Sequence, residues 1–302
     1  MTKLDFGAFV LGGNVFGWTV QREEAFHLLD AFLDHGGRMI DTSDSYPPGG
    51  EGGGSETIIG EWIASRGHRE RVMIATKVAK WPKQPGLSPA NIASAVEGSL
   101  RRLRTDHIDL YYAHEDDPNV EQAEYVEAFD HLRRDGKVRM VGASNFTAER
   151  LASSLVVARA NGLRGFEISQ DHWNLVERGF ERTLLPVIER EGLKELPFFS
   201  LAMGFLTGKY RPGTKVESVR SARAGKYLDQ HKNVRLLHAL DELAETHKAS
   251  VAAISLAWLK AHAVCGAPIA SARTPVQLRA LFESGTVKLA PAEVAKLSAI
   301  TA

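Results

Sequence analysis

The chain has 302 residues, of which 44% are hydrophobic and 25% are charged, a composition typical of globular proteins. Its 37 Lys and Arg residues balance 37 Asp and Glu residues, so no overall positive field favours nucleic acid, and no stretch reaches the roughly 18 apolar residues of a membrane helix. The single cysteine, Cys265, excludes an intrachain disulfide, and residues 1–13 lack the apolar core of a signal peptide, so we expect a cytoplasmic protein.

Strand-like and helix-like segments alternate along the chain. Short apolar runs predict strands, in chain order, at residues 8–13, 38–41, 71–77, 107–114, 137–145, 165–170, 196–202 and 267–272. Apolar residues at helical spacing predict helices at residues 22–36, 55–67, 88–103, 124–136, 148–162, 180–192, 234–247, 250–262, 274–284 and 290–300. Ser55 and Ser88 are the expected N-caps of the second and third helices, with Pro89 in the first turn, and Pro186 interrupts or starts the sixth helix.

Eight strands that alternate with helices predict parallel βαβ units. Eight such units in this length fit a (β/α)8 TIM barrel in a single domain over residues 1–302, whereas the rival, a doubly wound open sheet, usually has fewer strands. The polar stretch 207–232 interrupts the alternation. We interpret it as an excursion from the barrel, because no change in composition divides the chain into two domains.

Polar residues stand where the apolar strands end. In barrels of this type the chemistry lies at the C-terminal ends of the strands. Each such residue alone has an ordinary explanation, as a turn former, a solvated lysine or a hydrogen-bonded histidine, but a series of them on one rim indicates a site. They are Asp41, Lys77, His114, Ser144 with Asn145, and Gln170.

Tyr46 lies in the glycine-rich loop, residues 41–56, and suggests that proton transfer takes place at this rim. Lys77 near a phenol stabilises the phenolate, so we expect it to lower the pKa of Tyr46 from about 10, and we expect Asp41 to pair with Lys77. Such a phenol can give a proton to a carbonyl oxygen or take one from an alcohol. No metal site is expected, because the run after His114 lacks the His-Glu-x-x-His pattern. Residues 50–55 do not form a dinucleotide fingerprint, since they end in serine and carry a glutamate that would repel pyrophosphate.

Taken in order, these motifs resemble the aldo-keto reductase superfamily over nearly the whole chain. The matching segments are IDTSDSY with GSETIIGEWI, VMIATKV, SLRRLRTDHIDLYYAH, GKVRMVGASNF, QDHWNLVER, FFSLAMGFLTGKY and IASARTPVQL. The resemblance implies a (β/α)8 barrel that binds NADPH without a Rossmann motif. It also implies hydride transfer between the nicotinamide and a small carbonyl or alcohol substrate (an aldehyde, ketone or sugar).

The resemblance assigns roles to single residues. Tyr46 is implied as the proton donor, with Lys77 and Asp41 adjusting its pKa and His114 orienting the carbonyl. The implied cofactor residues are Ser144, Asn145 and Gln170 at the carboxamide, Phe198 stacked on the nicotinamide, Arg220 at the diphosphate, and Ser271, Arg273 and Gln277 at or just beyond the end of the eighth strand. Arg273 is placed at the 2′-phosphate, which favours NADP over NAD. Two positions depart from the usual pattern: Trp173 replaces a tyrosine beside the nicotinamide, and Leu281 replaces an asparagine that contacts adenine.

Other functions stay open on the sequence. The same fold can serve as a cofactor-binding regulatory subunit with little turnover, and Lys77 could be the Schiff-base amine of a lyase, although that would require a depressed lysine pKa. Trp18, Trp81 and Trp173 fall on expected rim loops, where they either line an aromatic pocket or pack the loops down.

Overall fold

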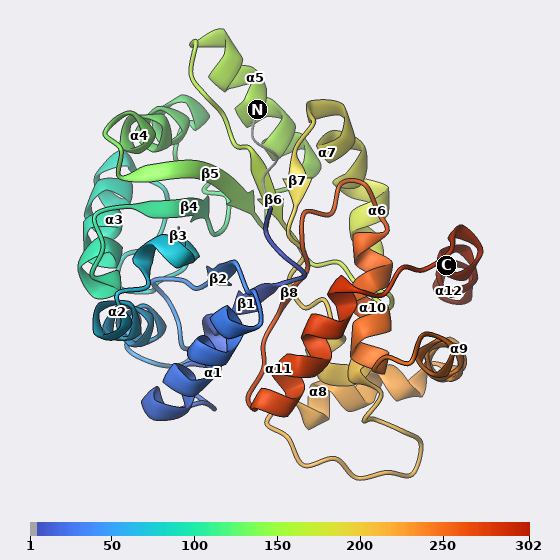
Figure 1. Ribbon diagram of the computed structural model, residues 1–302. Helices are drawn as coiled ribbons and strands as arrows, with labels where there is room; N and C mark the ends of the chain where they lie inside the picture. Colours follow the sequence, from blue (N-terminus) through green and yellow to red (C-terminus); the bar gives the residue numbers. More distant parts are fainter. Residues whose placement is uncertain (1–4) are drawn as a thin grey trace.

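The computed structural model describes residues 5–302 and contains a ring of parallel strands enclosed by helices (Figure 1). Hydrogen-bonded neighbours follow the order β7-β6-β5-β4-β3-β2-β1-β8. The two ends of this row meet, because the Gly266 N–H donates to the Glu195 carbonyl and the Ile269 N–H to the Pro197 carbonyl, both at 2.8 Å. The predicted (β/α)8 barrel is therefore confirmed, and closure excludes the doubly wound sheet. The strands are β1 (Val10–Gly12), β2 (Met39–Asp41), β3 (Met73–Val78), β4 (Ile108–Ala113), β5 (Val138–Ser144), β6 (Ile168–Gln170), β7 (Lys194–Glu195) and β8 (Ile269–Ala270).

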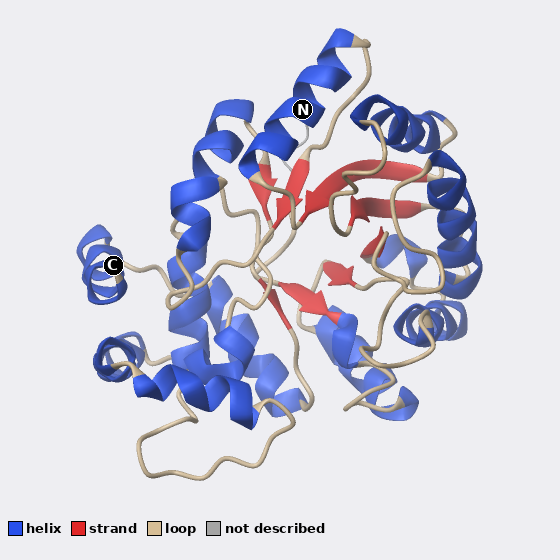
Figure 2. Ribbon diagram, turned by 180° about the vertical axis from the view of Figure 1, so that it is seen from behind, coloured by secondary structure: helices blue, strands red, loops and turns tan. Residues whose placement is uncertain are grey.

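Helices cover the outside of the barrel on all sides, as the view from behind in Figure 2 also shows. No helix within residues 5–302 is long and apolar enough to cross a membrane. The helices are α1 (Arg22–Asp34), α2 (Gly54–Arg66), α3 (Pro89–Leu103), α4 (Gln122–Arg134), α5 (Ala148–Ala160), α6 (Gly179–Thr183), α7 (Leu185–Glu191), α8 (Ser221–Gly225), α9 (His231–His247), α10 (Val251–Lys260), α11 (Pro275–Phe282) and α12 (Pro291–Thr301).

The two predicted serine caps have different outcomes. Ser88 caps α3 as expected, since its side chain accepts a hydrogen bond from the Asn91 N–H at 3.2 Å. Ser55 is not the cap of α2: that position is Gly53, in a left-handed conformation with φ 71°. The Ser55 hydroxyl is instead buried and donates to the Gly13 carbonyl at 2.8 Å, which ties α2 to the loop after β1.

The second half of the barrel departs most from the prediction. The expected strand 196–202 is wrong, because β7 ends at Glu195 and the following chain turns through Phe199, Ala202 and Met203 with φ between 46° and 58°. Extended strands cannot contain such angles. The expected helix 180–192 is broken into α6 and α7 at Leu184. The polar excursion contains the short α8 and stays attached to the barrel (Figure 1).

Residue parity along the strands brings the polar strand ends to the barrel axis. Successive side chains of a strand point to opposite faces, so residues two apart share a face. On β4, Leu110 and Tyr112 belong to the apolar cluster inside the barrel, and His114 follows at the same parity. Asp41, Lys77, Ser144 and Gln170 likewise share the parity of the interior residues Met39, Ala75, Met140 and Ile168. The interior is therefore apolar in its lower part and polar at its C-terminal rim.

Candidate active site

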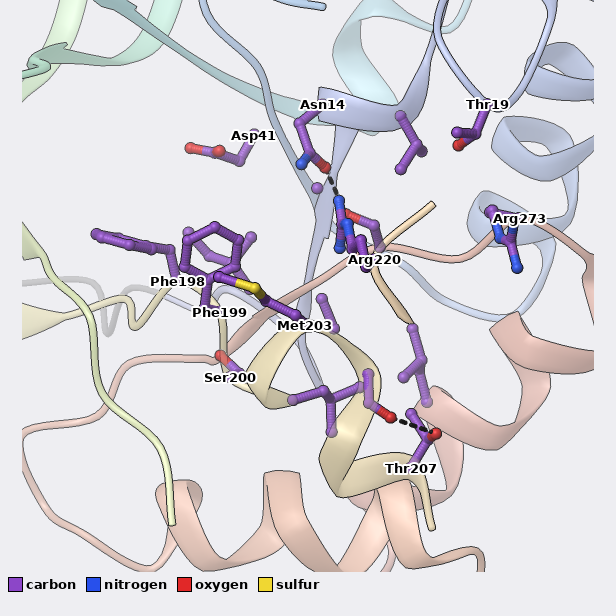
Figure 3. A pocket seen from close by; sticks show the side chains of 18 of the residues that line it. Asn14, Thr19, Asp41, Phe198, Phe199, Ser200, Met203, Thr207, Arg220 and Arg273 are labelled. Carbon is purple, nitrogen blue, oxygen red and sulfur yellow. Dashed lines mark hydrogen bonds between the residues drawn. The ribbon is translucent and has the colours of Figure 1, made fainter. Parts of the chain in front are cut away.

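The C-terminal ends of the strands surround a cavity of about 600 Å³. Figure 3 shows Asp41, Phe198 and Phe199 toward one side of it, Arg273 toward the other and Arg220 between them. Eleven of the twelve expected site residues border this cavity, and Lys77, the twelfth, lies directly beneath it, bonded to Asp41. The eleven are Asp41, Tyr46, His114, Ser144, Asn145, Gln170, Phe198, Arg220, Ser271, Arg273 and Gln277.

Lys77 is held as a buried ammonium ion. Its side chain is fully buried, and its Nζ donates to Asp41 Oδ2 at 2.6 Å and to the Thr42 carbonyl at 2.7 Å. The other oxygen of Asp41 accepts from Gln170 Nε2 at 2.9 Å. Burial favours the neutral amine, but nearby negative charge, that of the Asp41 carboxylate first, outweighs it and raises the pKa of Lys77. A Schiff-base amine needs the opposite shift, so the geometry speaks against the lyase hypothesis.

Tyr46 lies between Lys77 and His114. The Lys77 Nζ is 5.2 Å from the centre of the Tyr46 ring, and the His114 ring meets it edge to face at 5.9 Å between centres. Burial raises the pKa of Tyr46, and Lys77 opposes this only in part. The expectation that Lys77 brings this pKa below its ordinary value is therefore wrong for the structure, because the cost of burying a phenolate is the larger effect. The phenol stays protonated and can donate.

His114 is joined to a hydroxyl and a carboxyl group that the sequence reasoning missed. Its Nδ1 lies 3.2 Å from Ser43 Oγ, which is 3.1 Å from Asp44 Oδ1 and 2.9 Å from Ser45 Oγ. Burial, followed by the charges of two lysines, lowers the pKa of His114 well below its ordinary value, so its ring is neutral. Burial and the Glu56 carboxylate raise the pKa of Asp44 to about 7. The only sequence signal was the density of polar residues directly after Asp41.

The rim beside this group presents amides. Asn145 takes the left-handed conformation, with φ 57°, which asparagine adopts more readily than most residues. Its Nδ2 donates to the His114 carbonyl and to Ser144 Oγ, both at 2.9 Å, and its N–H donates to Asp171 Oδ1 at 3.1 Å. These contacts fix Asn145, which borders the cavity, and leave its Oδ1 free to accept a hydrogen bond.

Three cations gather at the opposite end of the cavity. Lys209, Arg220 and Arg273 all border it, and within residues 5–302 none of them has a carboxylate within 4.0 Å. Burial and then repulsion by Arg273 lower the pKa of Arg220, and burial and the two arginines lower that of Lys209. Arg220 also lies over the Trp18 ring at 5.7 Å. Mutually repelling cations without a partner form a site for an anion with several charges, and Lys209 is a member that the sequence reasoning missed.

The aromatic residues at the rim divide into two groups. Trp18 borders the cavity and is 37% exposed, and Phe198 borders it with its ring stacked on His172 at 5.5 Å. Trp81 instead packs on the glycine-rich loop, where its Nε1 donates to the Glu51 carbonyl at 3.1 Å. Trp173 is fully buried and its ring does not border the cavity, so the expected place beside the nicotinamide is wrong for it.

The residues present fit a nicotinamide adenine dinucleotide cofactor. The cavity joins an amide-rich rim at Ser144, Asn145 and Gln170 to a cluster of unpaired cations, and these match the carboxamide and the phosphates of such a molecule. Gly12 also borders the cavity, and a Cβ there would lie 2.6 Å from Ser271 Oγ, so a larger residue at this position would displace Ser271. Within the described residues, no three His, Cys, Asp or Glu side chains are grouped so that they could hold a metal ion.

Comparison with known proteins gives the chain its relatives. The model of the Aldo/keto reductase family matches residues 3–302. The uncharacterized oxidoreductase YrpG of Bacillus subtilis is 35% identical over 95% of this chain and 90% of its own length. Norsolorinic acid reductase stcV of Emericella nidulans is 34% identical over 97% of this chain and 76% of its own. A probable aryl-alcohol dehydrogenase of Saccharomyces cerevisiae, AAD4, is 31% identical over 93% of this chain and 89% of its own.

Proposed function

This chain belongs to the aldo/keto reductase family, whose members are oxidoreductases of carbonyl and alcohol groups, and we propose that it is an NADP-dependent enzyme with Tyr46 as its proton donor. The observation that carries the proposal is the arrangement of the cavity. A protonated phenol lies between a buried ammonium and a neutral histidine at one end, and three unpaired cations stand at the other.

When bound, NADPH supplies the hydride that forms the new C–H bond at the carbonyl carbon. Ser144, Asn145 and Gln170 would hold its carboxamide, and the Phe198 ring would lie against its nicotinamide, since stacking needs the ring and not a hydroxyl. Arg220 would bind the diphosphate. These residues fix the cofactor end of the cavity and leave the space beside Tyr46 for the substrate.

Tyr46 donates its proton to the substrate oxygen as negative charge develops there. The phenolate left behind is stabilised by the Lys77 ammonium, and Asp41 keeps that ammonium charged and in place. A neutral His114 can hydrogen-bond to the same oxygen through Nε2, because its other ring nitrogen, Nδ1, is engaged with Ser43 Oγ at 3.2 Å. The contact with Ser43 holds the ring in place.

The preference for NADP over NAD is supported by the number of cations. A diphosphate is matched by one or two cations, whereas Lys209, Arg220 and Arg273 together suit the additional charge of a 2′-phosphate. The backbone N–H of Arg273 donates to Gln277 Oε1 at 2.9 Å, which fixes the turn that carries the Arg273 side chain.

The test is the variant Tyr46→Phe, which removes only the phenolic oxygen. It should lose nearly all reduction of carbonyl compounds in a screen with NADPH while it binds NADPH as tightly as the natural chain, measured by fluorescence titration. Near-normal reduction by the variant would overturn the mechanism. A natural chain that binds NADPH yet reduces none of a broad set of aldehydes, ketones and sugars would favour the regulatory subunit instead.

A further inference from the structure

One lysine at the catalytic end of the cavity has no part in the reaction described above. Lys80 lies two residues beyond the end of β3, is half-buried, and borders the cavity together with Tyr46 and His114. Its Nζ is 3.7 Å from Glu115 Oε2, which is longer than a hydrogen bond. No other carboxylate of residues 5–302 lies within 4.0 Å of it. The ammonium therefore keeps its hydrogen-bonding capacity for a group in the cavity.

The charges around Lys80 leave it without full compensation. Burial lowers its pKa, Glu115 opposes that shift, and Lys77 lowers the pKa further. Asp171, the other acid nearby, already accepts hydrogen bonds on both carboxylate oxygens from other residues, and His114 is neutral. An anion beside Lys80 would offset both its burial and its repulsion by Lys77.

The cavity wall at this end is aromatic. Phe199 borders it and is 36% exposed, and its ring meets that of Phe198, which is assigned to the nicotinamide, edge to face at 5.3 Å between centres. Aromatic rings at the mouth of a cavity suit a flat, apolar body, which they can contact by stacking or by an edge. A molecule that satisfies this wall and Lys80 together has an apolar ring and a negative charge.

We propose that Lys80 binds an anionic group of the substrate, so that the enzyme prefers aromatic carbonyl compounds that carry a carboxylate. The inference rests on the proposed function, because the carbonyl must lie at Tyr46 and His114. It is separate from cofactor binding, since the cations assigned to the phosphates come from the second half of the chain. Glu115 competes for the same ammonium. Removal of Lys80 should therefore weaken the preference for anionic substrates, and removal of the Glu115 charge should strengthen it.

The experiment compares benzaldehyde with 3-carboxybenzaldehyde at saturating NADPH. The natural chain should have the higher kcat/KM for the carboxylated substrate. Lys80→Met should lower the ratio of the two kcat/KM values by about tenfold or more, the worth of a hydrogen bond to a charged group. Glu115→Gln should raise that ratio. Lys83→Met is the matched control, because Lys83 is exposed, pairs with Glu51 and does not border the cavity, and it should leave the ratio unchanged.

A second measurement does not depend on turnover. Benzoate should bind the natural chain saturated with NADP+ in a calorimetric titration and should bind Lys80→Met at least tenfold more weakly. If both aldehydes are inert but benzoate binding depends on Lys80, the proposed function fails and the anion site stands. If the aldehydes are reduced with the same ratio in Lys80→Met and Lys83→Met, or if benzoate binds both variants equally, the anion site is refuted.

Discussion

Replacement of Asp44 by asparagine should stabilise the protein, and more so as the pH rises. The Asp44 side chain is fully buried, its Oδ2 has no hydrogen-bond partner among the described residues, and its Oδ1 accepts only from the Ser43 hydroxyl. Burial, and then the nearby Glu56 carboxylate, raise its pKa from the ordinary 3.8 to about 7. The folded chain therefore holds a proton on Asp44 at pH values where the unfolded chain has lost it.

The sign and size of the effect follow from this difference. Between about pH 4 and pH 7 the folded state binds more protons than the unfolded state, so the free energy of unfolding falls as the pH rises through this window. Three pKa units at about 1.4 kcal/mol each give a penalty of about 4 kcal/mol above pH 7. Asparagine cannot ionise, so Asp44→Asn escapes this penalty at pH 8 and has no such advantage at pH 4.

Urea unfolding of the natural chain and of Asp44→Asn, followed at pH 5 and at pH 8, measures the difference. From pH 5 to pH 8, the free energy of unfolding of the variant should rise by several kcal/mol relative to that of the natural chain. Asp34→Asn, at an exposed residue near the end of α1, is the control and should change stability by less than about 0.5 kcal/mol at either pH. If the variant is no more stable than the natural chain at pH 8, ionisation of the buried Asp44 does not destabilise the folded state, and the reasoning is refuted.

Three further changes test other parts of the structure. Arg273→Ala should weaken NADPH binding by about tenfold or more and NADH binding much less, since only NADPH has a 2′-phosphate; equal losses in fluorescence titrations would remove that role. Gly53→Ala should lower the free energy of unfolding by about 1–3 kcal/mol, because φ is 71° and the added Cβ would lie 2.4 Å from Arg102 Cδ; an unchanged urea midpoint would argue against this cap. Trp173→Phe should lower the free energy of unfolding by about 1–3 kcal/mol through loss of the 2.9 Å hydrogen bond to Glu181, and should leave KM unchanged. A raised KM at unchanged stability would indicate that Trp173 contacts the substrate.

The barrel and its polar rim could be predicted because both depend on short-range patterns. Alternation of apolar runs with helical periodicity determines the βαβ units, and two-residue parity then determines which polar side chains reach the axis. Asp41, Lys77 and His114 end or follow apolar runs at that parity, so their convergence follows from the sheet alone.

The errors arose where a long-range contact decided the local structure. Residues 196–202 are apolar without lying in a strand, because Phe198 and Phe199 border the cavity while Leu196 and Ala202 are buried in the core. Ser55 resembles a helix cap, but its hydroxyl is taken by the Gly13 carbonyl, 42 residues earlier. The pKa of Tyr46 depends on how deeply the side chain is buried, and burial cannot be read from the spacing of residues in the sequence. Lys209 could not be recognised because its partners, Arg220 and Arg273, approach it only in the folded chain.

The order in which the site residues occur along the chain has a practical consequence. The groups assigned to proton transfer and to the carboxamide lie between Asp41 and Gln170, whereas the unpaired cations lie between Lys209 and Arg273. The residues assigned to proton transfer and the cations assigned to the cofactor phosphates thus lie in two consecutive, non-overlapping stretches of sequence. We therefore expect that exchange of one contiguous segment between relatives alters the choice of cofactor while the proposed proton donor and its supporting residues are inherited unchanged.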